Sequence, residues 1–435
     1  MVKRMVAVNR LTFVLIIMSC ASLAIMAADA ADYTLEIFGN ADMDDTIDED
    51  DVTYLEGIID GTNEETQLAD ANYDGQIDEG DIAQIEQIIA DGEKELTIVD
   101  SNGGDVTIKK PVERLVVLGD SQADAVRVLR AEEKVVGIDS SLPEEYVLLP
   151  VMSKLPTVGD YLEPDAEAIL ALEPDMVLGY YSLKSELDEE IAPNVAVVRI
   201  NSRGSNMEEE LKKLGYILDR RAEAEEFCEW HGEHIEMIHS RIEGLSEEDK
   251  PTIFIEAFPH YSEYYTRNKD SVEGYVCEMA GGTNIAADKL SGVVDAEWVI
   301  TENPEFIFIG AMSADPSGYG IDDMAGVDAT RDGVINRPEL KDVKAIRNGN
   351  CYCVASDIVH SIQQIISISY LAKLLHPELF EDLDPEAIHK EYLNRFQRID
   401  YDLDDHGVFV YPPIEIDGGL AGIPDRYVPQ SHGAS

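Results

Sequence analysis

The chain has 435 residues, 45% of them hydrophobic, so it is long enough for about two to four domains and apolar enough to bury a full core. Its 88 acidic residues outnumber 33 basic ones and give a formal net charge of −55, which excludes nucleic acid as a partner. We expect most of the carboxylates to form a solvated acidic surface.

Residues 1–30 are predicted to be a signal peptide or an N-terminal anchor. Basic residues precede an apolar run at 11–27, and small residues follow it. Three outcomes remain open: cleavage near Ala28 or Ala30, lipidation of Cys20, or retention as an uncleaved anchor. Each outcome places the mature chain outside the cytoplasmic membrane, either secreted or anchored to its outer face, with membrane association only through the N-terminus.

Residues 31–92 differ from the rest of the chain in composition. From 32 to 92 there are 20 acidic residues and no Lys or Arg, and a twelve-residue pattern occurs twice at an offset of 30 residues. Oxygen-bearing residues at positions 1, 3, 5, 7, 9 and 12 are the pattern of an EF-hand calcium loop, in which position 7 offers its backbone carbonyl. We therefore expect two calcium ions as cofactors. The ligand positions are Asn40, Asp42, Asp44, Thr46, Asp48 and Asp51 in the first loop, and Asp70, Asn72, Asp74, Gln76, Asp78 and Asp81 in the second.

The two loops are predicted to differ in affinity. Position 6 requires a sharp turn, which Gly75 allows better than Asp45, so the second site is expected to bind calcium more tightly. Isoleucine at position 8 of each loop is expected to pair the loops across a short β contact. One amphipathic helix is predicted after each loop, at 52–59 and 82–90.

This pair of loop–helix units, each with Asp at position 12, resembles a type I dockerin over nearly all of residues 31–92. The resemblance implies a small all-α, EF-hand-like calcium-binding domain that docks onto cohesin modules. Dockerins set their partner choice at loop positions 10 and 11. Those positions are acidic here, which leaves the partner open: Glu49, Asp50, Glu79 and Gly80.

Residues 95–205 are predicted to form an N-terminal α/β lobe after a short linker. A hairpin is expected to turn at Asn102 and Gly103. Strands that alternate with helices indicate a parallel sheet, in which ligands meet the loops at the carboxyl ends of the strands. The predicted strands are 114–118, 135–138, 175–178 and 195–200, with a helix at 123–129.

Residues 206–248 are predicted to be a rigid spanning helix. Apolar residues recur at helical spacing from 206 to 245 without a proline, and Gly215 and Gly232 are weak points within continued periodicity. At ~1.5 Å per residue, the part from 219 to 245 alone would run ~40 Å, which is about the width of a domain.

The α/β pattern restarts in residues 249–411, the predicted C-terminal lobe. Cys351 and Cys353 are expected to pack in its core, because alternate residues of a strand point the same way and the sparse, odd set of five cysteines makes no disulfide framework. The tail at 412–435 lacks periodicity and is expected to be loosely ordered. The predicted elements are strands at 252–257, 306–309 and 351–355 and helices at 272–280, 361–375 and 385–396.

A second internal repeat places one unit in each lobe. Residues 166–178 match 296–308: a short helix that opens with Glu, a turn at proline, and a strand. Glu167 and Glu297 fall in the first helical turn, where the helix dipole alone would favour a carboxylate.

Two α/β lobes, a spanning helix and this repeat resemble the class III substrate-binding proteins of ABC importers, over about residues 96–412. The segments DSNGGDVTIKKPVERLVVL, GGTNIA and RNGNCYCV add to the resemblance. It implies two Rossmann-like lobes, no enzymatic activity, and delivery of an iron–siderophore complex, haem or cobalamin to an ABC permease. It also implies that Glu167 and Glu297 bind arginines of that permease.

The residues that bind the metal-chelate ligand are expected on loops after strands. Aromatic rings suit a large flat or chelated ligand, and His or Tyr can touch an exposed metal. Cations for an anionic ligand are few, with Arg199 and Arg267 the nearest besides Arg203. The candidates are Tyr161, Tyr180, Tyr181, Arg203, His260, Tyr264 and His360.

Two other classes of protein remain alternatives. A dockerin usually accompanies a secreted polysaccharide hydrolase, but no GxSxG or HExxH motif is present and the chain has only two tryptophans. A cell-surface scaffold would not need the repeated glutamate. Residues 328–339 also fit a calcium loop, but Pro338 stands at position 11 and we expect a chance match.

Overall fold

The computed structural model describes residues 34–183, 186–191, 195–259, 261–289, 291–310, 317–416 and 419–427. The predicted signal peptide or anchor, with Cys20, and the candidate ligand residue His260 lie outside these ranges. Among the helices of the described ranges, none is both long and apolar enough to cross a membrane.

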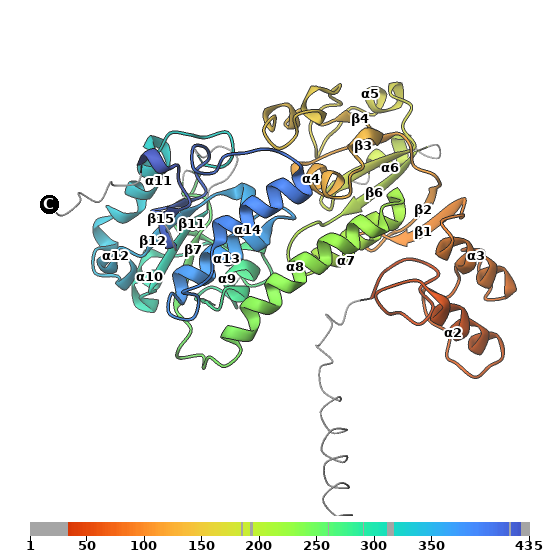
Figure 1. Ribbon diagram of the computed structural model, residues 1–435, viewed down its shortest axis with the longest axis horizontal. Coiled ribbons are helices and arrows are strands. Elements are labelled where there is room, and N and C mark those ends of the chain that lie inside the picture. Colours follow the sequence, from red (N-terminus) through yellow and green to blue (C-terminus); the bar gives the residue numbers. More distant parts are fainter. Residues whose placement is uncertain are drawn as a thin grey trace, which may run out of the picture.

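The N-terminal lobe is built on a four-stranded parallel sheet with the order β4-β3-β5-β6 (Figure 1). Its strands are short apolar runs whose residues are almost all buried, as expected for a parallel sheet covered on both faces. The four predicted strands are confirmed. The elements are β3 (Leu115–Val117), α4 (Asp120–Val128), β4 (Val135–Ile138), α5 (Ala166–Ala171), β5 (Met176–Tyr180), α6 (Glu186–Ile191) and β6 (Ala196–Ile200).

The C-terminal lobe has a five-stranded sheet with the order β13-β12-β11-β7-β9, parallel except for the edge strand β13. Cys351 and Cys353 are buried in β12, which confirms their predicted packing role. The strands are β7 (Thr252–Glu256), β9 (Thr283–Asn284), β11 (Phe306–Gly310), β12 (Cys351–Val354) and β13 (Val410–Tyr411). The helices are α9 (Val272–Met279), α10 (Ala296–Glu302), α11 (Ala325–Ile335), α12 (Lys344–Asn348), α13 (Gln364–Leu375) and α14 (Pro385–Tyr392). A small ribbon pairs β8 (Tyr265–Thr266) with β10 (Gly292–Val293).

The predicted spanning helix is a helical hairpin rather than one continuous rod. Helix α7 (Met207–Leu218) ends at Asp219, whose left-handed backbone (φ 58°) reverses the chain, and α8 (Arg221–Ile242) runs back along it. Glu208, early in α7, therefore contacts His231, midway along α8, at 2.6 Å. The prediction of a single helix from 206 to 248 was wrong, because the apolar periodicity continues through the turn.

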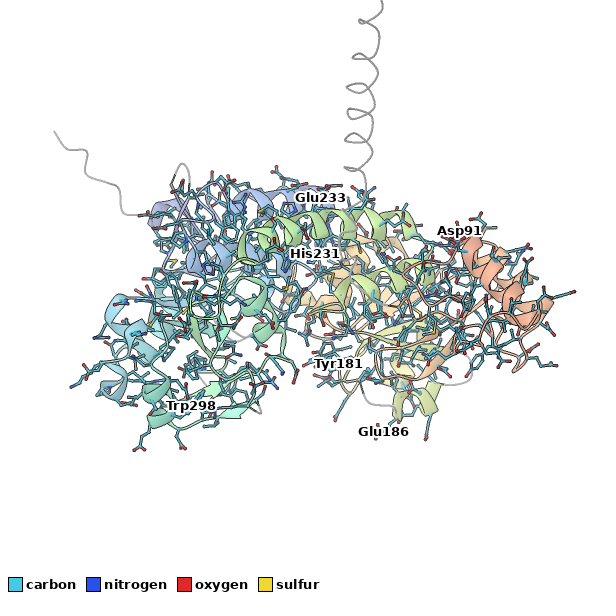
Figure 2. All side chains as sticks on the ribbon, turned by 90° about the horizontal axis from the view of Figure 1, so that it is seen from below. Asp91, Tyr181, Glu186, His231, Glu233 and Trp298 are labelled. Carbon is cyan, nitrogen blue, oxygen red and sulfur yellow. The ribbon has the colours of Figure 1, made fainter. Side chains whose placement is uncertain are left out.

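Helix α8, which carries His231 and Glu233, runs from one lobe to the other (Figure 2). Its 22 residues span ~33 Å, enough to pass from one lobe to the other. Arg220 just before it bonds Glu133 of the N-terminal lobe at 2.7 Å, and Arg241 near its end bonds Asp382 of the C-terminal lobe at 2.6 Å. A second link is the pair of hydrogen bonds between Gly204 and Gln364, at 2.8 and 2.9 Å. These links oppose a wide opening of the lobes.

The loop–helix units at 40–89 pack directly on the N-terminal lobe. Helices α2 (Glu49–Ile59) and α3 (Glu79–Ile89) each start right after a loop, and both begin with an Asp N-cap in a reciprocal capping box. Strands β1 (Glu95–Val99) and β2 (Asp105–Lys109) form the predicted hairpin, and Ile37 bridges to Ile98 of β1. One hydrophobic core runs through both parts, and it includes Leu35, Ile37, Ile47, Leu55, Ile88, Leu96 and Ile98.

The first loop is held by the helical hairpin rather than by the second loop. The Ile47 N–H donates to the Tyr216 hydroxyl at 3.0 Å, and Lys212 bonds Asp45 at 2.6 Å. No β-bridge joins Ile47 to Ile77 in the part of the chain that the structure describes, so the expected loop-to-loop contact was wrong. The described elements of residues 34–92 are therefore part of the N-terminal lobe in packing, although they differ from it in composition.

The predicted loose tail is ordered up to residue 427. Strands β14 (Ile414–Ile416) and β15 (Gly419–Ala421) pair antiparallel, and the carbonyl of Gly422 accepts hydrogen bonds from Phe409 and Val410. Ile414, Ala421 and Ile423 are buried. The prediction failed because three apolar residues spaced among prolines and glycines have no recognisable period.

Candidate binding site between the lobes

The carboxyl ends of the N-terminal strands carry an aromatic group capped by an arginine. Tyr180 ends β5, and its ring lies 4.3 Å from that of Tyr181 and 6.4 Å from that of Tyr161. Arg203, which follows β6, places its guanidinium 4.5 Å from the Tyr180 ring centre and 5.9 Å from that of Tyr181. Tyr181 lies at the margin of this lobe that faces the other lobe (Figure 2). The rings are steeply inclined to one another, so this group offers aromatic faces and edges and a cation to a ligand.

The C-terminal lobe contributes a group of charged residues to the junction. Glu273, at the start of α9, bonds both Arg267 and His360 at 3.1 Å. Burial opposes ionisation of Glu273, but the hydrogen bond and charge of His360 and the charge of Arg267 outweigh it and lower the pKa of Glu273 to about 2. The carbonyl of His360 accepts from Arg203 at 3.4 Å, so this group adjoins the N-terminal aromatic group.

Carboxylates from both lobes form the other side of the junction. Asp120 begins α4, Glu145 follows the turn after β4, and Asp357 follows β12. Burial, with the charges of Asp357 and Asp120, raises the pKa of Glu145 to about 7. Burial and the charge of Asp120 also raise the pKa of Asp357 to about 6, against the hydrogen bond that its carboxylate accepts from the Tyr319 N–H. Asp120 acts on Arg203 as well, so the carboxylates and the aromatic group share one site.

The structure brings together five of the seven predicted ligand residues: Tyr161, Tyr180, Tyr181, Arg203 and His360. Tyr264 is placed in the core of the C-terminal lobe, where it is buried, its hydroxyl bonds Glu339 at 2.7 Å and its ring lies under Arg337.

Several charged residues at the junction were not among the predicted ligand contacts. Arg199 is a structural residue, because it is buried and bonds Asp188 at 2.9 Å. Arg267 and Glu273 pair within the C-terminal lobe, where His360, which is distant in sequence, joins them, and no local pattern reveals this group. Asp120 and Asp357 had a usable signal, since each comes within a few residues of the end of a buried parallel strand.

The larger hollows of the described surface lie elsewhere. One of about 410 Å³ separates the first loop from the helical hairpin, and one of about 580 Å³ separates the second loop from β1 and β2. A small apolar cavity of about 30 Å³ lies beside Glu273 and His360. We place the ligand at the junction of the lobes, because only there do strand ends, aromatic rings and charges converge.

The repeated helix–strand units are confirmed in detail. Helices α5 and α10 and strands β5 and β11 correspond at a constant offset of 130 residues, from 166 and 296 to 180 and 310. Each helix is followed by a left-handed residue, Glu173 or Asn303, and a buried proline. Glu167 and Glu297 are exposed at equivalent positions, and one helical turn later Leu170 and Ile300 are exposed as well.

The two predicted calcium loops have matching internal contacts. Position 12 of each loop accepts hydrogen bonds from the N–H groups of positions 3 and 9, at 3.2 and 2.8 Å for Asp51 and at 3.0 and 2.8 Å for Asp81. Burial raises the pKa of Asp51 to about 7 and raises that of Asp81, and none of the predicted carboxylate ligands forms an ion pair with a cation of the described chain. The residues present therefore fit a hard cation.

No group of three or more His, Cys, Asp and Glu side chains could hold a metal ion within the described ranges. The four aspartates of each predicted calcium loop are therefore not gathered into such a group, and the case for calcium rests on the spacing of the oxygen ligands. Residues 328–339 do not form a loop, because most of the segment belongs to helix α11. This helix agrees with the expectation that the calcium pattern of residues 328–339 is a chance match.

A family model described as "Periplasmic binding protein" matches residues 115–357, from β3 to the turn after β12. The uncharacterised ABC transporter substrate-binding lipoprotein YvrC of Bacillus subtilis is 24% identical over 289 residues, which cover 64% of this chain and 84% of that protein. The molybdate-binding protein MolA of Haemophilus influenzae is 24% identical over 325 residues, 68% of this chain and 89% of that protein. The crystal structure of the TroA-like periplasmic binding protein FepB from Veillonella parvula has the same fold, with a TM-score of 0.59 at 22% identity, over 74% of this chain and 99% of that chain.

The matched segment is more than half of the chain and contains most of both lobes and all of α8. The family binds solutes and performs no chemistry, so the hydrolase alternative was wrong. The chain belongs to the periplasmic binding protein family.

Proposed function

We propose that the protein captures a metal chelate outside the cytoplasmic membrane and delivers it to the permease of an ABC importer. The observation that carries this proposal is the junction of the lobes, where Tyr161, Tyr180 and Tyr181 with Arg203 face Arg267, Glu273 and His360. Aromatic rings beside mixed charges suit a large ligand with polar substituents better than a simple ion. Iron–siderophore complexes, haem and cobalamin are the proposed ligands, with molybdate as the alternative that MolA suggests.

The test is thermal unfolding of the full chain, at constant calcium, with ferric siderophores, haem, cobalamin and molybdate. A ligand at a hundred times its dissociation constant adds ~2.7 kcal/mol to the stability and raises Tm by a few degrees. One strong shift supports the proposal and gives the ligand class. The absence of a shift with all of them would count against capture of a metal chelate.

We propose that the permease binds the two repeated units. In Figure 2, Trp298 of α10 and Glu186 of α6, which contacts α5, both lie on the side of the molecule away from α8. Each unit carries an exposed glutamate followed one helical turn later by an exposed aliphatic residue: Glu167 with Leu170, and Glu297 with Ile300. A carboxylate next to an apolar residue fits a partner that offers a cation beside an apolar pocket.

Exchange of Glu167 and Glu297 for lysine is expected to abolish uptake while ligand affinity and Tm stay unchanged, because both residues are exposed and far from the ligand site. Uptake of the radiolabelled ligand from the thermal screen is measured in cells that carry the importer and lack their own copy of this chain. The matched control exchanges the exposed Glu248 and Glu378 for lysine. Equal uptake by both double variants would remove the two glutamates from the permease interface.

We propose that the loops at 40–51 and 70–81 bind two calcium ions. Calcium would add hard positive charge where several carboxylates lie together without a paired cation, and the chain's own residues would hold it through the predicted oxygen ligands. The exposed Glu49, Asp50 and Glu79 at the loop ends are the residues we propose for docking a cohesin-type partner.

Addition of calcium to the chelator-treated full chain is expected to raise Tm by several degrees, and Asp74→Ala is expected to reduce that rise. The full chain is needed because the loops share a core with the N-terminal lobe. Calorimetry with and without calcium measures the effect. Glu64→Ala is the control, since Glu64 is exposed and lies between the loops. A calcium response that is unchanged in Asp74→Ala would rule out the second site.

A further inference from the structure

The carboxylates at the lobe junction constrain the charge of the ligand, given that the junction is the ligand site proposed above. Asp120 and Glu145 come from the N-terminal lobe and Asp357 from the C-terminal lobe. Behind them, Asp124 is 4% exposed, and its carboxylate accepts a hydrogen bond from the amide of Gln363 at 3.3 Å. The lobes therefore meet with like charges on both sides.

These charges are not neutralised by the protein. In the described part of the chain, none of the four carboxylates forms an ion pair with Lys or Arg. Arg127, His360 and Arg203 act on Asp124, Asp357 and Asp120 through their charge. Their direct contacts are with other groups, since Arg127 bonds Gln397, His360 bonds Glu273, and Arg203 stacks on Tyr180. Asp357 is fixed by the Tyr319 N–H at 3.0 Å, so it cannot simply turn away.

The chain's acidity explains an exposed carboxylate such as Asp120, but not the half-buried Glu145 and Asp357 or the buried Asp124. A solvated surface carboxylate costs little, whereas carboxylates that are partly desolvated and held against one another destabilise the folded state. In keeping with that cost, the pKa values of Glu145 and Asp357 are raised by burial and by mutual repulsion. A cation placed between the lobes removes the repulsion, and so gains more free energy here than at an exposed acidic patch.

The aromatic group supplies the rest of the ligand's shape. Tyr161 packs edge-on against Tyr180, and Tyr181 is tilted against Tyr180. The charge of Asp120 acts on Tyr161, Arg203 and Asp357. A ligand in this site meets rings and a guanidinium on one side and three carboxylates on the other.

We infer that the ligand is a metal chelate that carries a cationic substituent, such as an ammonium group, which lies against Asp120, Glu145 and Asp357. A neutral or anionic chelate of the same shape leaves the carboxylates repelling one another. The binding site thus selects for charge in addition to size and aromatic surface.

The test compares three ferric chelates by calorimetric titration of the full chain: ferrioxamine B, which has a pendant ammonium group; N-acetylferrioxamine B, which has the same metal centre without that charge; and ferric citrate, which is anionic. Ferrioxamine B is expected to bind at least about tenfold more tightly than its acetylated form. The preference should weaken as the salt concentration rises.

Two variants test whether the junction carboxylates cause the preference for the cationic chelate. Asp357→Asn keeps an acceptor for the Tyr319 N–H, and Glu145→Gln keeps the size of the side chain. Each is expected to reduce the preference for ferrioxamine B over its acetylated form several-fold. Glu144→Gln, at an exposed neighbouring position, is the matched control. Unchanged Tm shows that each variant folds, and either variant alone suffices for the comparison.

The outcomes separate this inference from the proposed function. Tighter binding of ferrioxamine B that depends on Asp357 or Glu145 supports both. Equal binding of the two ferrioxamines, or tighter binding of ferric citrate, overturns the charge preference and leaves capture of a metal chelate standing. Absence of binding by these chelates, together with no thermal shift from haem, cobalamin or molybdate, overturns both.

Discussion

Replacing Arg337 with methionine is expected to lower the free energy of unfolding of the C-terminal lobe by roughly 3–5 kcal/mol. Arg337 makes a two-pronged ion pair with Glu256, at 2.9 and 2.7 Å, and the side chains are 7% and 0% exposed. The arginine also lies over the Tyr264 ring. Its loss would leave the Glu256 carboxylate buried, with the Tyr264 N–H, at 3.0 Å, as its one remaining donor among the described residues.

Calorimetry resolves this effect as a lower unfolding temperature of the affected lobe. The double variant Arg337→Met, Glu256→Gln is expected to recover part of the loss, because the amide carries no buried charge and still accepts from the Tyr264 N–H. Arg347→Met, in the last turn of the nearby helix α12, is the control for removal of an arginine. A double variant no more stable than Arg337→Met would mean that the arginine acts through packing and not through the charge of Glu256.

The position of Arg337 shows how a sequence pattern can mislead. It stands inside the segment 328–339, which matches a calcium loop residue by residue. In the fold, Asp328 bonds the Tyr411 hydroxyl at 2.6 Å and Glu339 bonds the Tyr264 hydroxyl at 2.7 Å, so two of the would-be ligands serve as ordinary hydrogen-bond partners. The helical periodicity of 325–335 decides the local structure, and the spacing of acidic residues does not.

The two lobes could be predicted because their strands are continuous apolar runs and because the helix–strand unit at 166–178 recurs at 296–308. The turn at Asp219 could not be predicted from the sequence. Aspartate adopts the left-handed conformation at small cost, so it ends a helix without the glycine or proline that would mark the break. Gly215, the expected weak point, instead lies inside α7, where its missing side chain lets Ala224 of α8 approach closely.

The binding site was predictable on one side and not on the other. Tyr180 and Arg203 follow strands directly, so the rule for parallel sheets places them near the ligand. Glu273 lies on a helix and His360 on a turn, and they meet Arg267 only when the C-terminal lobe has folded. The absence of an ion-pair partner for Asp357 likewise depends on which residues of the other lobe lie near it. A local sequence pattern does not contain that information.

Acid is expected to destabilise the protein through His389, by roughly 4 kcal/mol between pH 6.5 and 3. Burial and the charge of Lys390 lower the pKa of His389 to about 3, whereas an unfolded histidine titrates near 6.5. Between these values the unfolded chain binds the extra proton, so the stability contributed by neutral His389 is complete above pH ~6.5 and is lost as the pH falls toward 3.

The surroundings of His389 explain why the folded protein disfavours protonation of this side chain. Its Nε2 bonds the Tyr319 hydroxyl at 2.6 Å, and that hydroxyl donates its own proton to Gln363, so Nε2 carries the hydrogen. Its Nδ1 has no partner in the described structure, and the ring is packed edge-on against Phe409 at 4.6 Å. A second proton on Nδ1 would create a charge that no neighbouring group can stabilise.

The effect is measured as the difference in Tm between the protein and His389→Phe from pH 7 to pH 4. The comparison is needed because Glu145 and Asp357 have raised pKa values and act with the opposite sign, gaining stability as they take up protons below pH 7. Loss of the hydrogen bond to Tyr319 makes the variant less stable at pH 7, and this cost does not depend on pH. The difference in Tm is therefore expected to shrink, and to reverse in acid, as His389 of the wild-type protein takes up a proton. A variant of the exposed His239 is the control. A difference in Tm that stays constant from pH 7 to pH 4 would show that His389 is not the acid-sensitive group.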